Sequence, residues 1–302
     1  MKRKARWTAV VLVLLATLAA GQAQQYLDVY TVQVKPEKRA EFDAIAKKIG
    51  AANRQNKGDA WLATETVYGQ GDRVSFISIR QGYGDAEKAT GAFYEAMQKA
   101  YGKPGTDKLF QDFSQCLASS RSEFRLRRWD LSSNAPTDAA AMTKLLGSSR
   151  WLRTAAVHVR PGQVAAFEAL LKDVKAAREK ASPPVTTLVS QAVAGQEGTV
   201  FYVTTLQSSL AGFDTIPTIQ QTLGEEGYAK YLKTVADVVA DSETLINRFL
   251  PELSNAPEDV VAVAPDYWTP KAMVAAGGKA KTTKGAVVNA SGTEKINDKE
   301  KQ

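Results

Sequence analysis

One histidine and one cysteine limit the chemistry available to this chain of 302 residues. His158 lies between Val157 and Val159, so on a strand its side chain is expected on the opposite face from these two valines. A single histidine cannot supply a His/Cys zinc cluster, and the sequence contains no H-E-x-x-H or C-x-x-C motif. A serine triad would need His158 as its base, and no G-x-S-x-G elbow accompanies it. We therefore expect no metal site and no cofactor.

An internal repeat relates several other polar residues in pairs. Shifted by 125 positions, residues 26–52 align with residues 151–177, and ten of the 27 aligned pairs are identical. A repeat this long indicates a duplicated domain, because solenoid repeats run over roughly 20–50 residues. Polar residues at matched strand positions are the candidate ligand-binding residues: Gln33 and His158, Glu65 and Gln191, and Arg127 and Arg248.

Each candidate also has a plainer structural interpretation. His158 could form a hydrogen bond with a neighbouring side chain, or it could ligate haem or a metal. Arg127 and Arg248 could face an anionic ligand together, or each could end a strand at the surface. Glu65 could act as a base if burial raised its pKa, or it could be an exposed strand carboxylate.

Both halves show the pattern strand, helix, strand, strand, helix, strand. Pro36 ends the strand at 27–34 and opens a helix, whose first turn tolerates proline. The connections at 69–72 and 195–198 are rich in glycine and predict hairpins. The other expected strands are residues 60–68, 73–80, 123–129, 186–194, 199–206 and 244–250. The other expected helical regions are residues 86–120, broken near Gly102 to Gly105, and residues 216–241.

This order is that of the split β-α-β, ferredoxin-like arrangement, which places both helices on one face of a four-stranded sheet. The other face must also be buried. The predicted fold class is therefore α+β: two tandem ferredoxin-like β-α-β-β-α-β repeats packed sheet to sheet as a pseudo-dimeric α+β barrel with an internal cavity. We assign the repeats to residues 24–136 and 137–257, the second with a helical linker at its start, and expect neither to fold well alone.

The segment that joins the first strand to the first helix carries a family resemblance. Val159-Arg-Pro-Gly-Gln-Val-Ala-Ala-Phe167 resembles the strand-to-helix signature of the dimeric α/β-barrel superfamily, and residues 34–42 are similar, with Glu37 where glycine is usual. That superfamily includes antibiotic-biosynthesis monooxygenase-like, NIPSNAP-like and EthD-like families. The resemblance implies a fold more than an activity. No catalytic set of these families maps onto this sequence residue by residue.

The ends of the chain have compositions of their own. Residues 1–23 combine basic residues, a short apolar run and small residues, which is typical of a secretory signal, so we expect export to the periplasm or outside the cell and a mature start near Gln24. Four of the 39 basic residues lie in this signal, so most of the net charge of +7 belongs to it and we expect no nucleic-acid partner. Residues 258–302 form a tail that we expect to be largely disordered, from Ala275 onward, while Val260 to Pro270, with Tyr267 and Trp268, could dock on the body.

Two functions remain open at this point. The first is an exported, non-catalytic protein that binds a small apolar or aromatic molecule in the inter-sheet cavity. The second is a cofactor-independent oxygenase or isomerase of the dimeric α/β-barrel type. We expect a monomer or weak homo-oligomer without a stable membrane span after signal cleavage, and a buried, structural Cys116.

Overall fold

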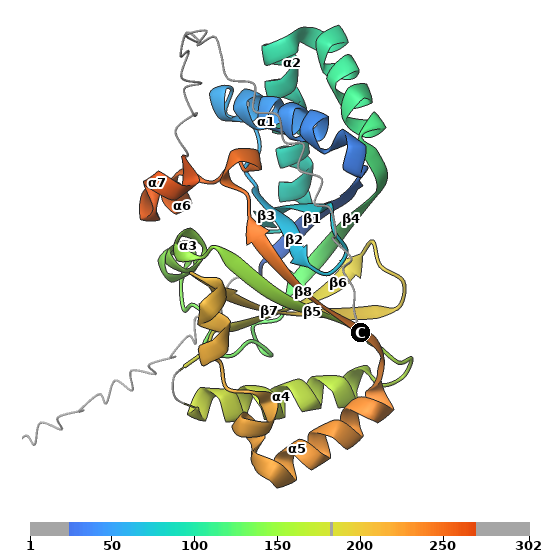
Figure 1. The fold of residues 1–302 in the computed structure, drawn as a ribbon, viewed down its shortest axis with the longest axis vertical. Coiled ribbons are helices and arrows are strands. Elements are labelled where there is room, and N and C mark those ends of the chain that lie inside the picture. Colours follow the sequence, from blue (N-terminus) through green and yellow to red (C-terminus); the bar gives the residue numbers. More distant parts are fainter. Residues whose placement is uncertain (1–23, 182–183, 270–302) are drawn as a thin grey trace, which may run out of the picture. The chain divides into compact units, whose positions relative to one another are not determined.

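Eight antiparallel strands, most of them rich in β-branched residues, close into one barrel, with helices outside it (Figure 1). The computed structural model describes residues 24–181 and 184–269. The first half contains β1 (Tyr26–Val34), the short helix η1 (Pro36–Lys38), α1 (Arg39–Gln55), β2 (Leu62–Tyr68), β3 (Arg73–Arg80), α2 (Tyr83–Gln115) and β4 (Leu117–Arg127). After α3 (Ala139–Ser148), the second half contains β5 (Trp151–Val159), α4 (Val164–Lys180), β6 (Thr187–Ala194), β7 (Thr199–Gln207), η2 (Leu210–Thr215), α5 (Ile219–Val238) and β8 (Val239–Phe249). The described chain ends with η3 (Pro251–Leu253), α6 (Glu258–Val263) and α7 (Pro265–Trp268).

The two halves join at the edges of their sheets. Around the barrel the strands follow the order β1-β3-β2-β8-β5-β7-β6-β4, and β4 pairs with β1. One seam pairs β2 with β8, and the other pairs β4 with β6. The expected α+β barrel is confirmed, but the two sheets close it by pairing edge to edge instead of stacking face to face. The physical reason is that a closed barrel leaves no strand edge with unpaired N–H and C=O groups.

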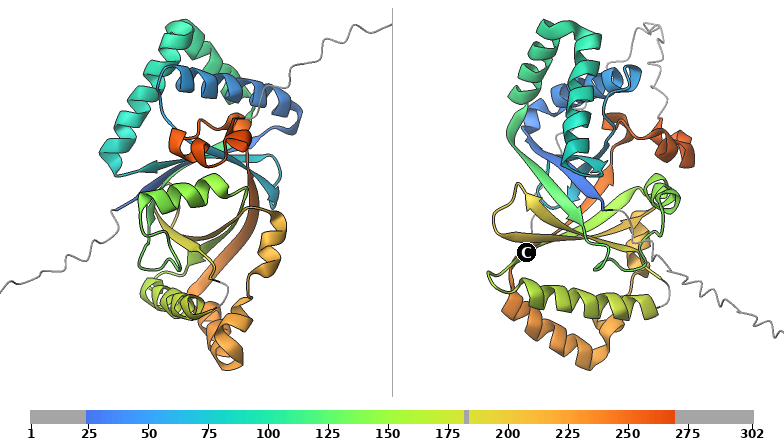
Figure 2. Two further views of the ribbon diagram at one scale, coloured as in Figure 1. Left: turned by 90° about the vertical axis from the view of Figure 1, so that its left-hand side faces the viewer. Right: turned by 180° about the vertical axis from the view of Figure 1, so that it is seen from behind.

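Helices cover opposite sides of the barrel (Figures 1 and 2). On one side α1 and α2 bury Phe42 and Met97 against Val32 of β1. On the other side α4 and α5 bury Phe167 against Phe201 of β7, with ring centroids 5.1 Å apart. Apolar residues of the strands therefore face outward toward the helices, and their alternate neighbours face the interior of the barrel.

A third cluster lies at one end of the barrel, where α3, α6 and α7 pack together (Figure 2). Trp268 is buried there, and its indole Nε1 donates a hydrogen bond to the carbonyl of Gly147 at 2.9 Å. A Cβ at Gly147 would lie only 2.5 Å from the Cβ of Val263, so glycine is needed for this close approach. The folded body thus extends beyond the second repeat, predicted to end at residue 257, to at least Thr269, and the segment with Tyr267 and Trp268 packs on it.

The predicted hairpins and the break in the long helix are confirmed, whereas two strand boundaries differ from the prediction. The hairpins at 69–72 and 195–198 are present, and α2 is kinked at Gly102, where φ is 65°. Cys116 is buried, as expected. However, β4 and β8 begin earlier than predicted, because polar residues such as Ser119 of β4 pair with β1 and polar residues such as Asp241 of β8 pair with β5. The signal at 1–23 and most of the tail lie outside the described residues. Within the described ranges, no helix has both the length and the apolar character that a membrane span needs.

Candidate functional site

The interior of the barrel contains a cavity of about 740 Å³. Because side chains alternate along a strand, every second residue of the eight strands reaches this cavity. Hydroxyl groups along the middle of its wall bond in pairs across neighbouring strands. Thr31 and Ser75 lie 2.9 Å apart, and Thr154 and Thr204 lie 3.0 Å apart. These pairs satisfy one another, so this part of the wall is polar but uncharged.

One end of the cavity is apolar. Leu188 and Phe249 line it from the strands, and Met142, Leu146 and Val260 line it from α3 and α6. The same residues belong to the cluster at that end of the barrel. The cavity therefore offers apolar contacts at this end and hydroxyl groups along its middle.

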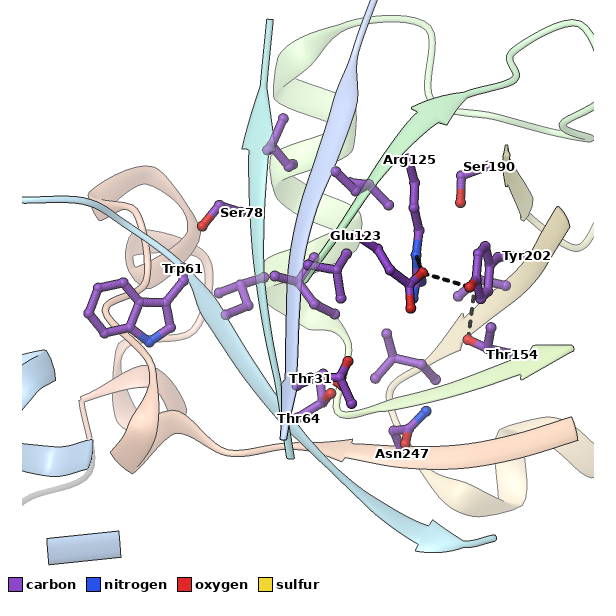
Figure 3. A pocket seen from close by; sticks show the side chains of 18 of the residues that line it. Thr31, Trp61, Thr64, Ser78, Glu123, Arg125, Thr154, Ser190, Tyr202 and Asn247 are labelled. Carbon is purple, nitrogen blue, oxygen red and sulfur yellow. Dashed lines mark hydrogen bonds and ion pairs between the residues drawn. The ribbon is translucent and has the colours of Figure 1, made fainter. Parts of the chain in front are cut away.

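A carboxylate on β4 organises the charged part of the wall (Figure 3). The buried Glu123 accepts hydrogen bonds from the hydroxyl of Tyr202 at 2.6 Å, from Gln196 Nε2 at 2.9 Å and from Arg125 Nε at 2.8 Å. The guanidinium of Arg125 also lies 3.5 Å from the centre of the Tyr202 ring, a cation–π contact. Burial raises the pKa of Tyr202 to about 12, assisted by its hydrogen bond to Glu123, so this hydroxyl is a donor at neutral pH.

Arg127 follows Arg125 on the same inward row of β4. Its side chain is 8% exposed, it lines the cavity, and its Nε has no hydrogen-bond partner. The centre of the Trp129 ring lies 5.6 Å from its guanidinium carbon. Burial, together with the charge of Arg125, lowers the pKa of Arg127 to about 10, which still leaves a cation at neutral pH. A buried cation without an anionic partner carries a substantial desolvation cost.

Unpartnered polar atoms gather at this cavity. Among the described residues, four buried side-chain nitrogen or oxygen atoms lack a partner, and three of them belong to cavity-lining residues: Gln25 Oε1, Gln33 Oε1 and Arg127 Nε. Buried polar groups are normally hydrogen-bonded, and each exception calls for an explanation such as a bound molecule.

The structure places Gln33 and His158 in the lining of this same cavity. Around the barrel, β5 is the fourth strand after β1. Because neighbouring strands are antiparallel, β1 and β5 run in the same direction. Gln33 and His158 therefore lie at the same end of the cavity, on opposite walls. Gln33 Nε2 donates a hydrogen bond to the carbonyl of Gly71 at 2.7 Å. A binding role for this pair stays a prediction.

Three other candidates lie on the outer face of the barrel, which corrects their proposed place at the ligand. Glu65 accepts a hydrogen bond from Arg39 of α1 at 2.8 Å and another from Arg248. Gln191 accepts one from Arg128 at 2.7 Å. Burial alone would raise the pKa of Glu65, but the two arginines lower it below its ordinary value, so it is not a base at neutral pH.

The pairing of Arg127 with Arg248 is also wrong by one residue. Tyr26 and Trp151 are equivalent in the repeat, and they pair with Leu126 and Arg248 respectively. The residue equivalent to Arg127 is therefore Phe249. A slip of one position along a strand moves a side chain to the opposite face, which explains why Arg127 lies inside the barrel and Arg248 outside.

Sequence reasoning missed Gln25, Glu123 and Arg125. The signal for two of them is the spacing Arg121, Glu123, Arg125, Arg127, in which charges recur at every second position of one strand. A strand with period-two charge exposes one charged face, and in a closed barrel that face is the interior.

No protein-family model matches this sequence, and no curated protein is significantly similar to it. Among solved structures, a candidate monooxygenase from Fusobacterium nucleatum subsp. nucleatum is similar, with 11% identity, coverage of 76% of this chain and 94% of that chain, and a TM-score of 0.48. An anthrone oxidase-like protein matches with 13% identity, coverage of 76% and 92%, and a TM-score of 0.48. A chlorite dismutase mutant from Candidatus Nitrospira defluvii matches with 11% identity, coverage of 79% and 94%, and a TM-score of 0.42. Likenesses this weak carry no information about the activity of this chain.

Proposed function

We propose that this protein binds a small organic molecule inside the barrel, without catalysing a reaction on it. The observation that carries the proposal is the cavity of about 740 Å³ whose lining includes the buried, unpartnered Arg127. Pockets that hold small molecules measure roughly 300–1,000 Å³ and combine an apolar lining with a few placed polar groups. This cavity has both features.

We further propose that the barrel consists of two tandem ferredoxin-like repeats of the dimeric α/β-barrel type, exported by the signal at residues 1–23. Three observations support the duplication. Each half has the same order of elements, the strands of one half follow those of the other by four places around the barrel, and residues 26–52 align with residues 151–177. In this scheme the ligand lies between two related halves whose side chains have diverged.

A cofactor-independent oxygenase or isomerase is the alternative, and it would need a base in the cavity. Glu65 is excluded from that role because it faces the helices and pairs with two arginines. Glu123 does line the cavity, but its carboxylate already accepts three hydrogen bonds, one of them from a cation. Both carboxylate oxygens are therefore already used as acceptors within the protein. The arrangement thus favours binding over proton abstraction.

Titration of the full-length protein with the fluorescent neutral probe N-phenyl-1-naphthylamine tests the proposal. We expect saturable binding of one probe per chain. Ala156→Trp fills the cavity from the middle of β5 and should abolish this binding, whereas Val193→Trp adds the same side chain at an exposed position of β6 and should not. Binding that a folded Ala156→Trp protein retains would place the probe elsewhere and contradict the proposal. Native mass spectrometry of the purified protein would reveal a retained natural ligand.

A further inference from the structure

We infer that the ligand is an organic anion and that Arg127 binds its acidic group. The inference rests on the proposed function, because it assigns the chemical class of the molecule held in the same cavity. Arg127 differs from the other arginines that reach the cavity wall in its lack of a polar partner.

Each of the other cavity-lining arginines already has a polar partner. Arg80 pairs with Asp59 and Asp28, Arg125 with Glu123, and Arg73 with Glu243. Arg121 donates a hydrogen bond to Gln196 at 2.7 Å. Within residues 24–181 and 184–269, Arg127 is the cavity-lining arginine for which no ion pair or side-chain hydrogen bond is present, and it is among the most buried of them. The guanidinium of Arg127 is therefore available to pair with an anion from outside the chain.

The surroundings of Arg127 fit the acidic end of an organic molecule better than a free inorganic ion. Ser190 lies opposite Arg127 in the pairing of β4 with β6, and both line the cavity, so the Ser190 hydroxyl is a donor on the same part of the wall. Leu188, two residues along β6, lines the same wall and belongs to the apolar end. A carboxylate or sulfonate would pair with Arg127 and accept from Ser190, while an attached apolar body would contact Leu188 and Met142. Guanidinium groups bind such planar or tripod anions through two parallel hydrogen bonds.

A purely structural role for Arg127 makes a different prediction about stability. Removing an arginine that holds the fold together should destabilise the protein. Replacing a buried, unpaired cation by an apolar side chain of similar length should instead be neutral or stabilising. Arg127→Met separates the two roles, because the inference predicts a melting temperature at least equal to that of the wild type together with a loss of anion binding.

Two probes that differ by one sulfonate test the inference. The neutral probe is N-phenyl-1-naphthylamine, and the anionic probe is 8-anilino-1-naphthalenesulfonate. We expect the wild-type protein to bind the anionic probe about tenfold or more tightly than the neutral one, and Arg127→Met to remove most of this preference while affinity for the neutral probe changes by less than about twofold. Arg127→Lys should keep part of the preference, because it retains the charge without the guanidinium fork.

Arg153→Met is the matched control. Arg153 lies on the outer row of β5, beside the ring of Phe213, so its loss removes one strand arginine without changing the cavity. It should leave the affinities for both probes unchanged. Equal wild-type affinities for the two probes, or an anion preference that survives Arg127→Met, would overturn the inference and leave the proposed function standing. Failure of both probes to bind saturably would instead refute the proposed function.

Discussion

Strands β4 and β8 occupy equivalent places in the barrel but present different inward faces. The inward row of β4 consists of Arg121, Glu123, Arg125 and Arg127, and that of β8 consists of Glu243, Leu245, Asn247 and Phe249. Both rows line the same cavity. Because the backbone positions of β4 and β8 are equivalent, the charges on β4 are not required by the fold. We attribute these charges to the molecule that the cavity binds.

The contrast is sharpest at the end of the two strands. Phe249 is 3% exposed and packs edge-on against Trp268, with ring centroids 5.4 Å apart. Its equivalent Arg127 is 8% exposed and lacks a partner for Nε. An aromatic side chain at this position stabilises the end of the barrel, whereas an arginine costs stability unless an anion pairs with it.

The largest effect should follow from the apolar member of this pair. Phe249→Ala should lower the free energy of unfolding by about 3–5 kcal/mol, because it removes a buried ring and leaves a cavity under Trp268. Chemical denaturation of the wild type and variant measures this loss. A loss below about 1 kcal/mol would mean that the end of the barrel is not packed as described.

Glu123→Gln should have the next largest effect. It leaves Arg125 without its counter-charge, and the two side chains are only 5% and 14% exposed. We expect a loss of about 2–4 kcal/mol in the free energy of unfolding. The double variant Glu123→Gln with Arg125→Met should recover part of that loss in the same denaturation assay. A double variant less stable than Glu123→Gln alone would show that Arg125 contributes mainly by packing on Tyr202.

Glu65→Gln probes the seam between β2 and β8, outside the cavity. We expect a loss of only about 1 kcal/mol at neutral pH, because Arg248 is half exposed and solvent screens the pair. The folded-state pKa of Glu65 lies below its ordinary value of 4.5, so this contribution is present above pH 4.5 and is lost as the pH falls through the folded-state pKa. The stability difference between wild type and variant should therefore shrink in acid. A difference that is constant from neutral to acidic pH would contradict the ion pair.

The smallest effect, and opposite in sign, belongs to Arg127. In the absence of ligand, Arg127→Met should raise the free energy of unfolding by about 1 kcal/mol, because it replaces an unpaired buried cation with an apolar side chain. Denaturation of Arg127→Met and Arg153→Met side by side measures the gain. A clear loss of stability at Arg127 alone would show that its charge has a partner within the protein.

Much of the fold follows from local patterns in the sequence. The alternation of β-branched residues, Pro36, and the glycine-rich connections predict the order of elements in each half, because these signals act within a few residues. The edge-to-edge closure could not be predicted in this way. It depends on pairing between β2 and β8 and between β4 and β6, whose residues are far apart in the chain.

The candidate site was predicted only in part, and the failures share a cause. Gln33 and His158 lie in the cavity lining because the repeat is strongest around β1 and β5, where its register is unambiguous. At β4 the sequence Leu117–Arg127 has little apolar alternation, so a slip of one residue matched Arg127 with Arg248 instead of Phe249. The sequence shows charges at every second position of β4, but only the pairing with β1 establishes that they face the interior.

Methionine methyl NMR provides the most direct test of the cavity as the binding site. Met142 lines the cavity from α3, whereas Met97, on α2, is fully buried in the cluster between the helices and the sheet and is not among the residues that line the cavity. With ¹³C-methyl-labelled methionine, assigned through Met142→Leu, addition of N-phenyl-1-naphthylamine should shift the Met142 signal and leave the Met97 signal unchanged. A shift at Met97 with none at Met142 would mean that the molecule binds between the helices and the sheet, and would contradict the account.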